Sequence, residues 1–325
     1  MKPFNKAVIS IGVAAACMLS NAAIAQPHID GVEAQSSAKF YRLKLNCQQN
    51  PLALQQYAAR GVWFKTQSEL EIRGECQGPV TFESDNISIV GDSSVASSIK
   101  SIQADMSVVT AIHSVVNLKN LTITTPSNVQ AVVAKGNSTL VLENITANSE
   151  NSDGVFYPFL ITDNSTAYVR KQSRAKFRVS GSSVIEFQAE NTEITLNVLD
   201  TSFARSTSGS QFSSVEVSGN GYFLADNQSS VALLMIWSKG AVDVDNQSSV
   251  GHLMMGGQTL FAAYHESSIT GPYEIYGNVV FELEHSTATG WTALDKPHSI
   301  FTGNEAVVNG VLYPSWSWYG QDGLE

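Results

Sequence analysis

A cationic segment in the middle of the chain carries the strongest chemical signal. It contains five basic residues, namely Arg170, Lys171, Arg174, Lys176 and Arg178. On one extended strand, all of them except Lys171 would share a face, with Tyr168 beside them. Guanidinium groups bind carboxylates through paired hydrogen bonds, so this face predicts a site for an acidic polysaccharide such as a uronate or a sulfated glycan.

The same segment has two other interpretations. A polysaccharide lyase needs a neutralised uronate carboxylate and a base for β-elimination, and crowded cations could provide both. Alternatively, the cations are structural, because Glu186, Glu190 and Glu193 follow within about one coil and could pair with them across strands. The sequence alone leaves glycan binding, catalysis and ion pairing open.

A second group combines acidic residues with histidine in the later part of the chain. Its members are Asp226, Asp243, Asp245, His265 and Glu284. A spacing of 19 residues stacks Asp226 on Asp245. It also places His265 beside Glu284 and Glu266 beside His285, so that each histidine lies next to a carboxylate. Stacked carboxylates repel each other unless hydrogen bonds or a cation such as calcium hold them. The group predicts a metal or acid–base site, and solvated turn residues are the alternative.

Aromatic residues near the C-terminus form a third candidate site. They comprise Tyr313, Trp316, Trp318 and Tyr319 in the last segment and Trp291 before it. Sugar rings stack on such surfaces, because tryptophan combines a flat apolar area with a polar edge. An end cap explains the same residues. Trp237 and Trp63 are predicted to be core or cap residues.

These candidate residues must be positioned by a repetitive β architecture. The hexapeptide Asp-Asn-Gln-Ser-Ser-Val at 226–231 recurs unchanged at 245–250. The same spacing of 19 continues in the column formed by Val231, Val250, Ile269 and Ala288. Stacking such short units about 4.8 Å apart pairs their strands and buries one continuous core. We therefore predict an all-β parallel solenoid of about twelve coils; a β-sandwich, the alternative, does not require a constant spacing.

Both ends of the predicted solenoid need caps, since an open coil exposes unpaired strand edges. A short capping helix is predicted from Pro51 to Arg60, with Asn50 as its N-cap. Cys47 and Cys76 are expected to form one structural disulfide in an oxidising compartment. The predicted solenoid domain spans 40–312 including this cap, and 313–325 form an aromatic C-terminal cap or tail.

The first residues are typical of a secretory signal. Lys2 and Lys6 precede an apolar run and a small-residue cleavage site, so we expect a signal peptide at 1–25 and a polar linker at 26–39. A lipoprotein signal that ends at Cys17 is the alternative. Loss of 1–25 leaves 17 basic residues against 29 acidic ones. The resulting charge of −12 argues against binding to nucleic acid, and we expect a secreted or periplasmic protein without a membrane span.

The N-terminal part of the chain resembles the right-handed parallel β-helix superfamily, often called pectin-lyase-like. The resemblance rests on the motifs at 45–47, 71–76, 80–82 and 86–91, around the predicted helix. The later Ser-Ser-Val coils look more like passenger domains of bacterial autotransporters. The resemblance covers most of 41–310 and implies a right-handed parallel β-helix solenoid with a short N-terminal capping helix. It implies no particular activity, because the signatures of pectate lyases and polygalacturonases are absent.

Three functions are compatible with the sequence. The lead hypothesis is a non-enzymatic exported solenoid that binds an acidic polysaccharide or acts at a cell surface. The alternatives are a polysaccharide lyase or glycoside hydrolase acting on an acidic glycan, and a structural, self-associating surface protein. The sequence requires no cofactor, and calcium is the ion that the acidic group suggests.

Overall fold

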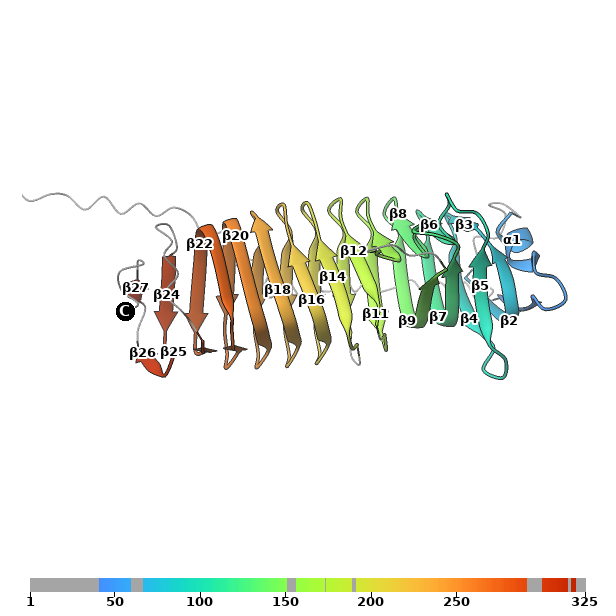
Figure 1. The fold of residues 1–325 in the computed structure, drawn as a ribbon. Helices are drawn as coiled ribbons and strands as arrows, with labels where there is room; N and C mark the ends of the chain where they lie inside the picture. The colour runs from blue at the N-terminus through green and yellow to red at the C-terminus, as the bar shows by residue number, and fades with distance from the viewer. Residues whose placement is uncertain are drawn as a thin grey trace, which may run out of the picture. The chain divides into compact units, whose positions relative to one another are not determined.

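The computed structural model describes residues 41–59, 67–150, 156–172, 174–188, 191–290, 300–314 and 317–319. The predicted signal peptide and linker lie outside these residues, as do Cys17, Trp63, Glu190, Trp291 and Trp316. The described residues belong to one compact unit. Its described part is an all-β parallel solenoid of about 11 turns, close to the predicted number (Figure 1). No helix within these described ranges is long and apolar enough to cross a membrane.

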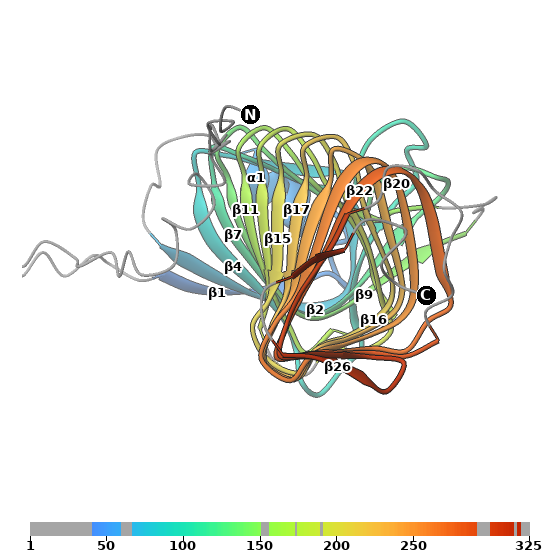
Figure 2. The same cartoon turned by 90° about the vertical axis from the view of Figure 1, so that its left-hand side faces the viewer.

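Three rows of stacked parallel strands form the wall of the solenoid, and Figure 2 shows the first row side by side. Face 1 consists of β1 (Tyr41–Asn46), the start of β2 (Ser68–Gly78), β4 (Asn86–Gly91), the starts of β7 (Val115–Thr125) and β9 (Thr139–Ser149), β11 (Thr166–Arg170), β13 (Val184–Phe187), β15 (Phe203–Ser206), β17 (Tyr222–Ala225), β19 (Ala241–Val244), the ends of β20 (Ser249–Ala263) and β22 (Tyr273–Glu284), and β24 (Ile300–Asn304).

The other two rows complete each coil. Face 2 contains the ends of β2, β7 and β9, β5 (Ser97–Ser101), the starts of β16 (Gln211–Val217), β18 (Ser230–Ser238) and β20, then β21 (Ser268–Ile269), β23 (Thr287–Ala288) and β25 (Ala306–Val308). Face 3 contains β3 (Val80–Glu83), β6 (Val109–Ile112), β8 (Val132–Lys135), β10 (Phe159–Ile161), β12 (Lys176–Val179), β14 (Ile194–Val198), the ends of β16 and β18, the middle of β20 and the start of β22.

The predicted column of residues at 19-residue spacing is confirmed. Val231 pairs with Val250, Val250 with Ile269, and Ile269 with Ala288 in successive strands. All four side chains are buried, because alternate residues of each strand point inward. Buried aromatic rings from all three faces also contact one another inside the coils, with neighbouring ring centroids 4.8–5.4 Å apart. The core is therefore continuous from coil to coil.

The N-terminal cap is a short helix tied to the first coils. Helix α1 spans Ala53–Ala58 and buries Leu54, so it is shorter than predicted. Its N-cap position is Leu52 and not Asn50, whose side-chain oxygen accepts the backbone N–H of Leu52 at 3.2 Å in the preceding turn. A disulfide joins Cys47 to Cys76, with both cysteines buried. This bond is compatible with a location outside the cytoplasm.

The strand direction reverses at the C-terminal end of the stack. Strand β26 (Val311–Tyr313) pairs antiparallel with β25, and β27 (Ser317–Tyr319) pairs antiparallel with β24. Trp318 lies opposite Thr302 in this second pairing. These strands occupy backbone groups that the last coil would otherwise leave unpaired.

The turn from face 1 to face 2 explains the repeated hexapeptide. Asn227 and Gln228 adopt left-handed backbone conformations, with φ of 52° and 63°, and the same pair recurs one coil later. Ser229 follows and is buried; its hydroxyl donates to the carbonyl of Asp226 at 2.6 Å, and its N–H donates to the hydroxyl of Ser248 at 3.1 Å. Asparagine tolerates the left-handed turn, and serine satisfies the backbone groups that the turn buries.

Candidate functional site

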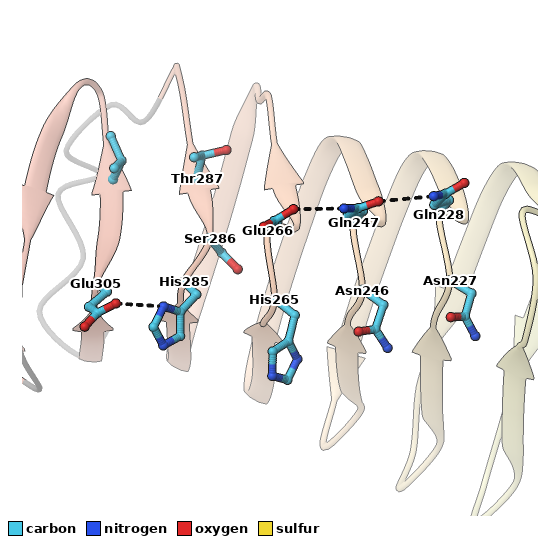
Figure 3. Close-up of a pocket in the computed structure, with 11 residues that line it drawn as sticks. Asn227, Gln228, Asn246, Gln247, His265, Glu266, His285, Ser286, Thr287 and Glu305 are labelled. Atoms are coloured by element: carbon cyan, nitrogen blue, oxygen red, sulfur yellow. Dashed lines mark hydrogen bonds and ion pairs between the residues drawn. The ribbon is translucent and has the colours of Figure 1, made fainter.

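An open groove follows the outside of these turns in the C-terminal half of the solenoid (Figure 3). We call it the corner groove, and its volume is about 1060 Å³. Its lining residues are Asn227, Gln228, Asn246, Gln247, His265, Glu266, His285, Ser286, Thr287, Glu305 and Val307. Because they occupy corresponding turns, successive coils contribute to one polar surface.

Two columns of side chains project from the left-handed turns into the groove. The first column consists of Asn227, Asn246, His265 and His285, and the second of Gln228, Gln247 and Glu266. His265 and Glu266 have φ of 46° and 63°, a region that is uncommon for residues other than glycine and asparagine. Left-handed residues also occupy turns outside the groove, such as Asn120 and Asn144, so this conformation belongs to the solenoid turn and sets the direction of the side chains.

The second column forms a chain of hydrogen bonds along the solenoid axis (Figure 3). Nε2 of Gln228 donates to Oε1 of Gln247 at 3.1 Å, and Nε2 of Gln247 donates to Oε2 of Glu266 at 2.9 Å. The carboxylate can only accept hydrogen bonds, so it orients both amides. Each amide has further donor and acceptor capacity, so a ligand in the groove meets both kinds of group.

Carboxylates beside the first column bond to a side chain of the next coil. Oδ1 of Asp226 accepts from Nδ2 of Asn246 at 2.7 Å, and Oδ1 of Asp245 bonds to Nδ1 of His265 at 2.5 Å. This hydrogen bond and the negative charge of Asp245 raise the pKa of His265. The His265 side chain is 65% exposed, so it can still meet a ligand while it is bound to Asp245.

The side chains of both histidines bond to carboxylates other than those predicted, namely Asp245 and Glu305. Strands β20 and β22 pair at a spacing of 20 residues on face 1, whereas the strands after the turn pair at 19. His265 hydrogen-bonds to Asp245 of the preceding coil, across the same offset of 20 residues that joins Asp226 to Asn246. The charge of Glu284 also contributes to the raised pKa of His265. His285 lies beside Glu266 as predicted, since its carbonyl accepts the backbone N–H of Glu266 at 2.7 Å, but its Nδ1 lies 2.9 Å from Oε2 of Glu305.

The five predicted metal ligands do not gather into one donor set. Asp243 lies on the outside of face 1, where the hydroxyl of Tyr222 donates to it and burial raises the pKa of its carboxyl. Glu284 accepts from Nδ2 of Asn304 at 3.2 Å. Across the part of the chain that the structure describes, no group of three or more His, Cys, Asp or Glu could hold a metal ion. Calcium binding is a prediction that gains no support there.

The cationic segment turns a corner, so the prediction of one basic strand face is wrong. Arg170 ends β11 on face 1, whereas Lys176 and Arg178 lie in β12 on face 3. Between them, Lys171 and Arg174 have left-handed φ values of 51° and 52°. Buried Gln172 holds this turn from inside, where it accepts the backbone N–H of Ile145 at 2.9 Å. The alternating pattern at 175–179 is typical of a strand and does not indicate the turn before it, because the inward residue of that turn, Gln172, is polar.

The cations of this turn have separate partners. Nε of Arg174 lies 2.8 Å from Oε2 of Glu193, and Nε of Arg170 donates to the side-chain oxygen of Gln188 at 2.6 Å. The guanidinium of Arg178 lies 4.6 Å from the ring centroid of Tyr157. Of the ion pairs predicted between this segment and the later glutamates, the one with Glu193 is therefore present.

Two other predicted contributors lie nearby. Glu186 pairs with Arg205 at 3.0 Å, outside the cationic segment. Tyr168 lies in register with Glu186 on the outside of face 1 and not on the strand that carries Lys176. The structure thus brings Tyr168 and Arg170 together in β11 and leaves the remaining cations in the turn and on face 3.

Sequence reasoning placed His265, Glu266 and His285 in a candidate site but missed that they continue two columns of amide side chains. It gave the repeated Asn and Gln residues a purely structural role in the turns. The signal that could have revealed the columns was the hexapeptide at 226–231 and 245–250, in which two adjacent polar residues recur at the coil spacing. Side chains that recur at this spacing and point outward form a ladder along the axis.

No known protein family, curated protein or solved structure matches this chain. The parallel solenoid agrees with a β-helix fold, and the resemblance to the pectin-lyase-like superfamily rests on the sequence motifs alone. Any function must therefore be inferred from the side chains and their geometry.

Proposed function

We propose that this protein binds an extended, hydroxyl-rich polysaccharide along the corner groove and does not transform it. The observation that carries this proposal is the double column of amide, imidazole and carboxylate side chains that repeats from coil to coil. Successive coils lie about 4.8 Å apart, a step similar in length to one pyranose unit of an extended polysaccharide. Successive sugar units of an extended polymer would therefore each lie beside one coil.

The chemistry of the groove suits sugar hydroxyls. Amides donate and accept hydrogen bonds at the same time, as hydroxyls do, and the carboxylate of Glu266 adds a stronger acceptor. The order of the Gln228, Gln247 and Glu266 ladder fixes these groups before a ligand arrives, so less side-chain entropy is lost on binding. An open groove also allows a polymer to extend beyond both ends of the site.

The charge of the groove favours a neutral polysaccharide. Glu266 and Glu305 line it, and Asp226 and Asp245 lie next to its first column. These carboxylates would repel a uronate or sulfate chain, which the sequence alone had favoured. The imidazole of His265 offsets one of them only when it is protonated.

An acidic polysaccharide is the second candidate, and a different observation favours it. Arg170, Lys171, Arg174 and Lys176 are exposed around one turn of the solenoid. Guanidinium groups at this turn have the chemistry to bind carboxylates, although Glu193 already neutralises Arg174.

Binding of soluble oligosaccharides to the purified protein tests the proposal. The panel contains hexamers of β-1,4-linked glucose, xylose and mannose, and hexamers of galacturonate and mannuronate, measured by calorimetry. The variants Asn246→Gly and Gln247→Gly remove groove amides while glycine preserves the left-handed backbone. We expect each to weaken binding of a neutral hexamer about three- to tenfold, the value of one hydrogen bond.

The matched control is Asn144→Gly, at another exposed left-handed position whose amide bonds to Asn120 at 3.0 Å outside the groove. It should bind as the unaltered protein does. Equal weakening by the control, or unaltered binding by both groove variants, would overturn the groove assignment. Binding of uronates alone, lost in Arg174→Ser with Lys176→Ser, would support the second candidate instead. New ultraviolet absorbance from unsaturated sugars would show a lyase and refute a purely binding role.

A further inference from the structure

A cluster of aromatic, thioether and hydrogen-bonding side chains lies on the outside of face 3, away from the corner groove. We call it the outer patch, and it consists of Met235 and Trp237 of β18, His252 and Met254 of β20, and Glu274 and Tyr276 of β22. The strand register aligns Met235 with Met254 and Glu274, and Trp237 with Gly256 and Tyr276. The patch therefore covers three adjacent coils.

Trp237 is not the core or cap residue that the sequence predicted. The alternation of β18 buries Leu234 and Ile236 and leaves Trp237 half-buried on the outer surface. A Cβ atom added to Gly256 would lie 2.6 Å from Cζ3 of Trp237, so the indole ring rests on the space that this glycine leaves free. Because Gly256 has no side chain, the indole ring can lie directly against the sheet.

A fixed polar edge borders the aromatic surface. One carboxylate oxygen of Glu274 lies 3.1 Å from Nε2 of His252, and the other accepts the hydroxyl of Tyr276 at 3.0 Å. This hydrogen bond and the charge of Glu274 raise the pKa of Tyr276. Tyr276 is 46% exposed. His252 and Tyr276 thus position the carboxylate of Glu274 from both sides, while the side chain of Tyr276 still faces solvent.

The solenoid itself does not require an apolar surface at this place. One coil earlier, Glu216 occupies the position of Met235, and two coils earlier Asn197 does. The core behind these positions remains apolar, with Val217 and Ile236 in register and buried. Because outer positions of the same face are polar in the preceding coils, folding of the coils does not by itself require apolar side chains in the outer patch.

We propose that the outer patch is a second sugar-binding site, which stacks a pyranose ring on Trp237 and Tyr276 and binds its hydroxyls through Glu274 and His252. A pyranose has an apolar C–H surface and a rim of hydroxyls, and the outer patch pairs a flat apolar surface with a fixed acceptor. A protein partner with an apolar surface would have to desolvate the carboxylate of Glu274, which is costly. A nucleic acid would meet a chain of net charge −10.

Saturation-transfer NMR with cellobiose, lactose and mannobiose tests this site, since it reports which ligand C–H groups contact the protein. We expect at least one disaccharide to show saturation of its ring protons and to bind about tenfold or more weakly to Trp237→Ala. Gly256→Ala should also weaken binding, because the new methyl group displaces the indole ring without removing an aromatic group. Tyr276→Phe should retain stacking but lose part of the affinity.

The groove variant Asn246→Gly is the matched control, because it alters the other site only. Ring saturation that is lost in Trp237→Ala and Gly256→Ala and retained in Asn246→Gly supports the outer patch, whether or not the corner groove binds a polymer. Circular dichroism shows whether each variant is folded. If Trp237→Ala does not fold, the result for Gly256→Ala decides whether the outer patch binds sugar. Saturation unchanged by both substitutions, or absent for every disaccharide, overturns the proposal. Self-association abolished by Trp237→Ala, without sugar binding, overturns it in favour of a protein interface.

Discussion

Replacing Gln247 by Glu tests whether the amide ladder of the corner groove is a connected structure. Gln247 donates to Glu266 at 2.9 Å and accepts from Gln228 at 3.1 Å. In Gln247→Glu, the donor to Glu266 is lost and a second carboxylate takes its place. The substitution leaves the size of the side chain unchanged, so any loss of stability comes from charge and hydrogen bonding.

The expected loss follows from the geometry. Two unit charges 2.9 Å apart repel by about 1.4 kcal/mol in a medium with the dielectric constant of water. The lost hydrogen bond adds about 1 kcal/mol. Side-chain relaxation and salt screening remove part of both contributions at an exposed position. We therefore expect the free energy of unfolding to fall by about 1–2 kcal/mol, and the melting temperature to fall by about 2–5 °C.

Differential scanning calorimetry in low salt measures this loss. The deficit should shrink in about 1 M salt, where the Debye length is about 3 Å. The double variant Gln247→Glu with Glu266→Gln is the matched control, since it restores one donor and one carboxylate in exchanged positions. It should recover most of the lost stability. A double variant no more stable than Gln247→Glu, or a single variant as stable as the unaltered protein at low salt, would refute the ladder.

Two further predictions concern the cap and a buried carboxyl. The double variant Cys47→Ala with Cys76→Ala should lose about 3–4 kcal/mol of stability in urea unfolding, because the bond closes a loop with a sequence separation of 29; an unchanged midpoint would contradict this. Burial raises the pKa of Asp243 in the folded protein above its unfolded-state value of 3.8. The free energy of unfolding should therefore fall as the pH rises from 3.8 through the folded-state pKa, because the folded protein must then hold a buried charge. Asp243→Asn should therefore gain stability relative to the unaltered protein across that window, and a pH-independent difference in melting temperature would count against burial as the cause.

The architecture was predictable because it depends on a local pattern repeated at a fixed distance. Val231, Val250 and Ile269 are apolar at a constant spacing, and stacking is the arrangement that buries all of them at once. The disulfide was predictable by elimination, since Cys47 and Cys76 are the cysteines beyond the N-terminal segment. Both conclusions are insensitive to an error of one residue in any turn.

The candidate sites were less predictable, because each depends on the direction of single side chains. The cationic segment alternates like a strand, yet left-handed residues at Lys171 and Arg174 divide it between two faces. The side chains of His265 and His285 bond to Asp245 and Glu305, which the spacing of 19 residues does not indicate. Since successive strand residues point to opposite sides, a shift of one residue changes every outward contact.

The amino-acid sequence by itself determined that this chain winds into stacked parallel coils around an apolar core. Burial requires only that apolar residues recur at the coil spacing, and that recurrence is written along the chain. Only the tertiary structure decided that Gln228, Gln247 and Glu266 form one ladder, and that Trp237 lies on the outer surface over Gly256. Such contacts join residues of different coils, and the conformation of every intervening turn sets which of them meet.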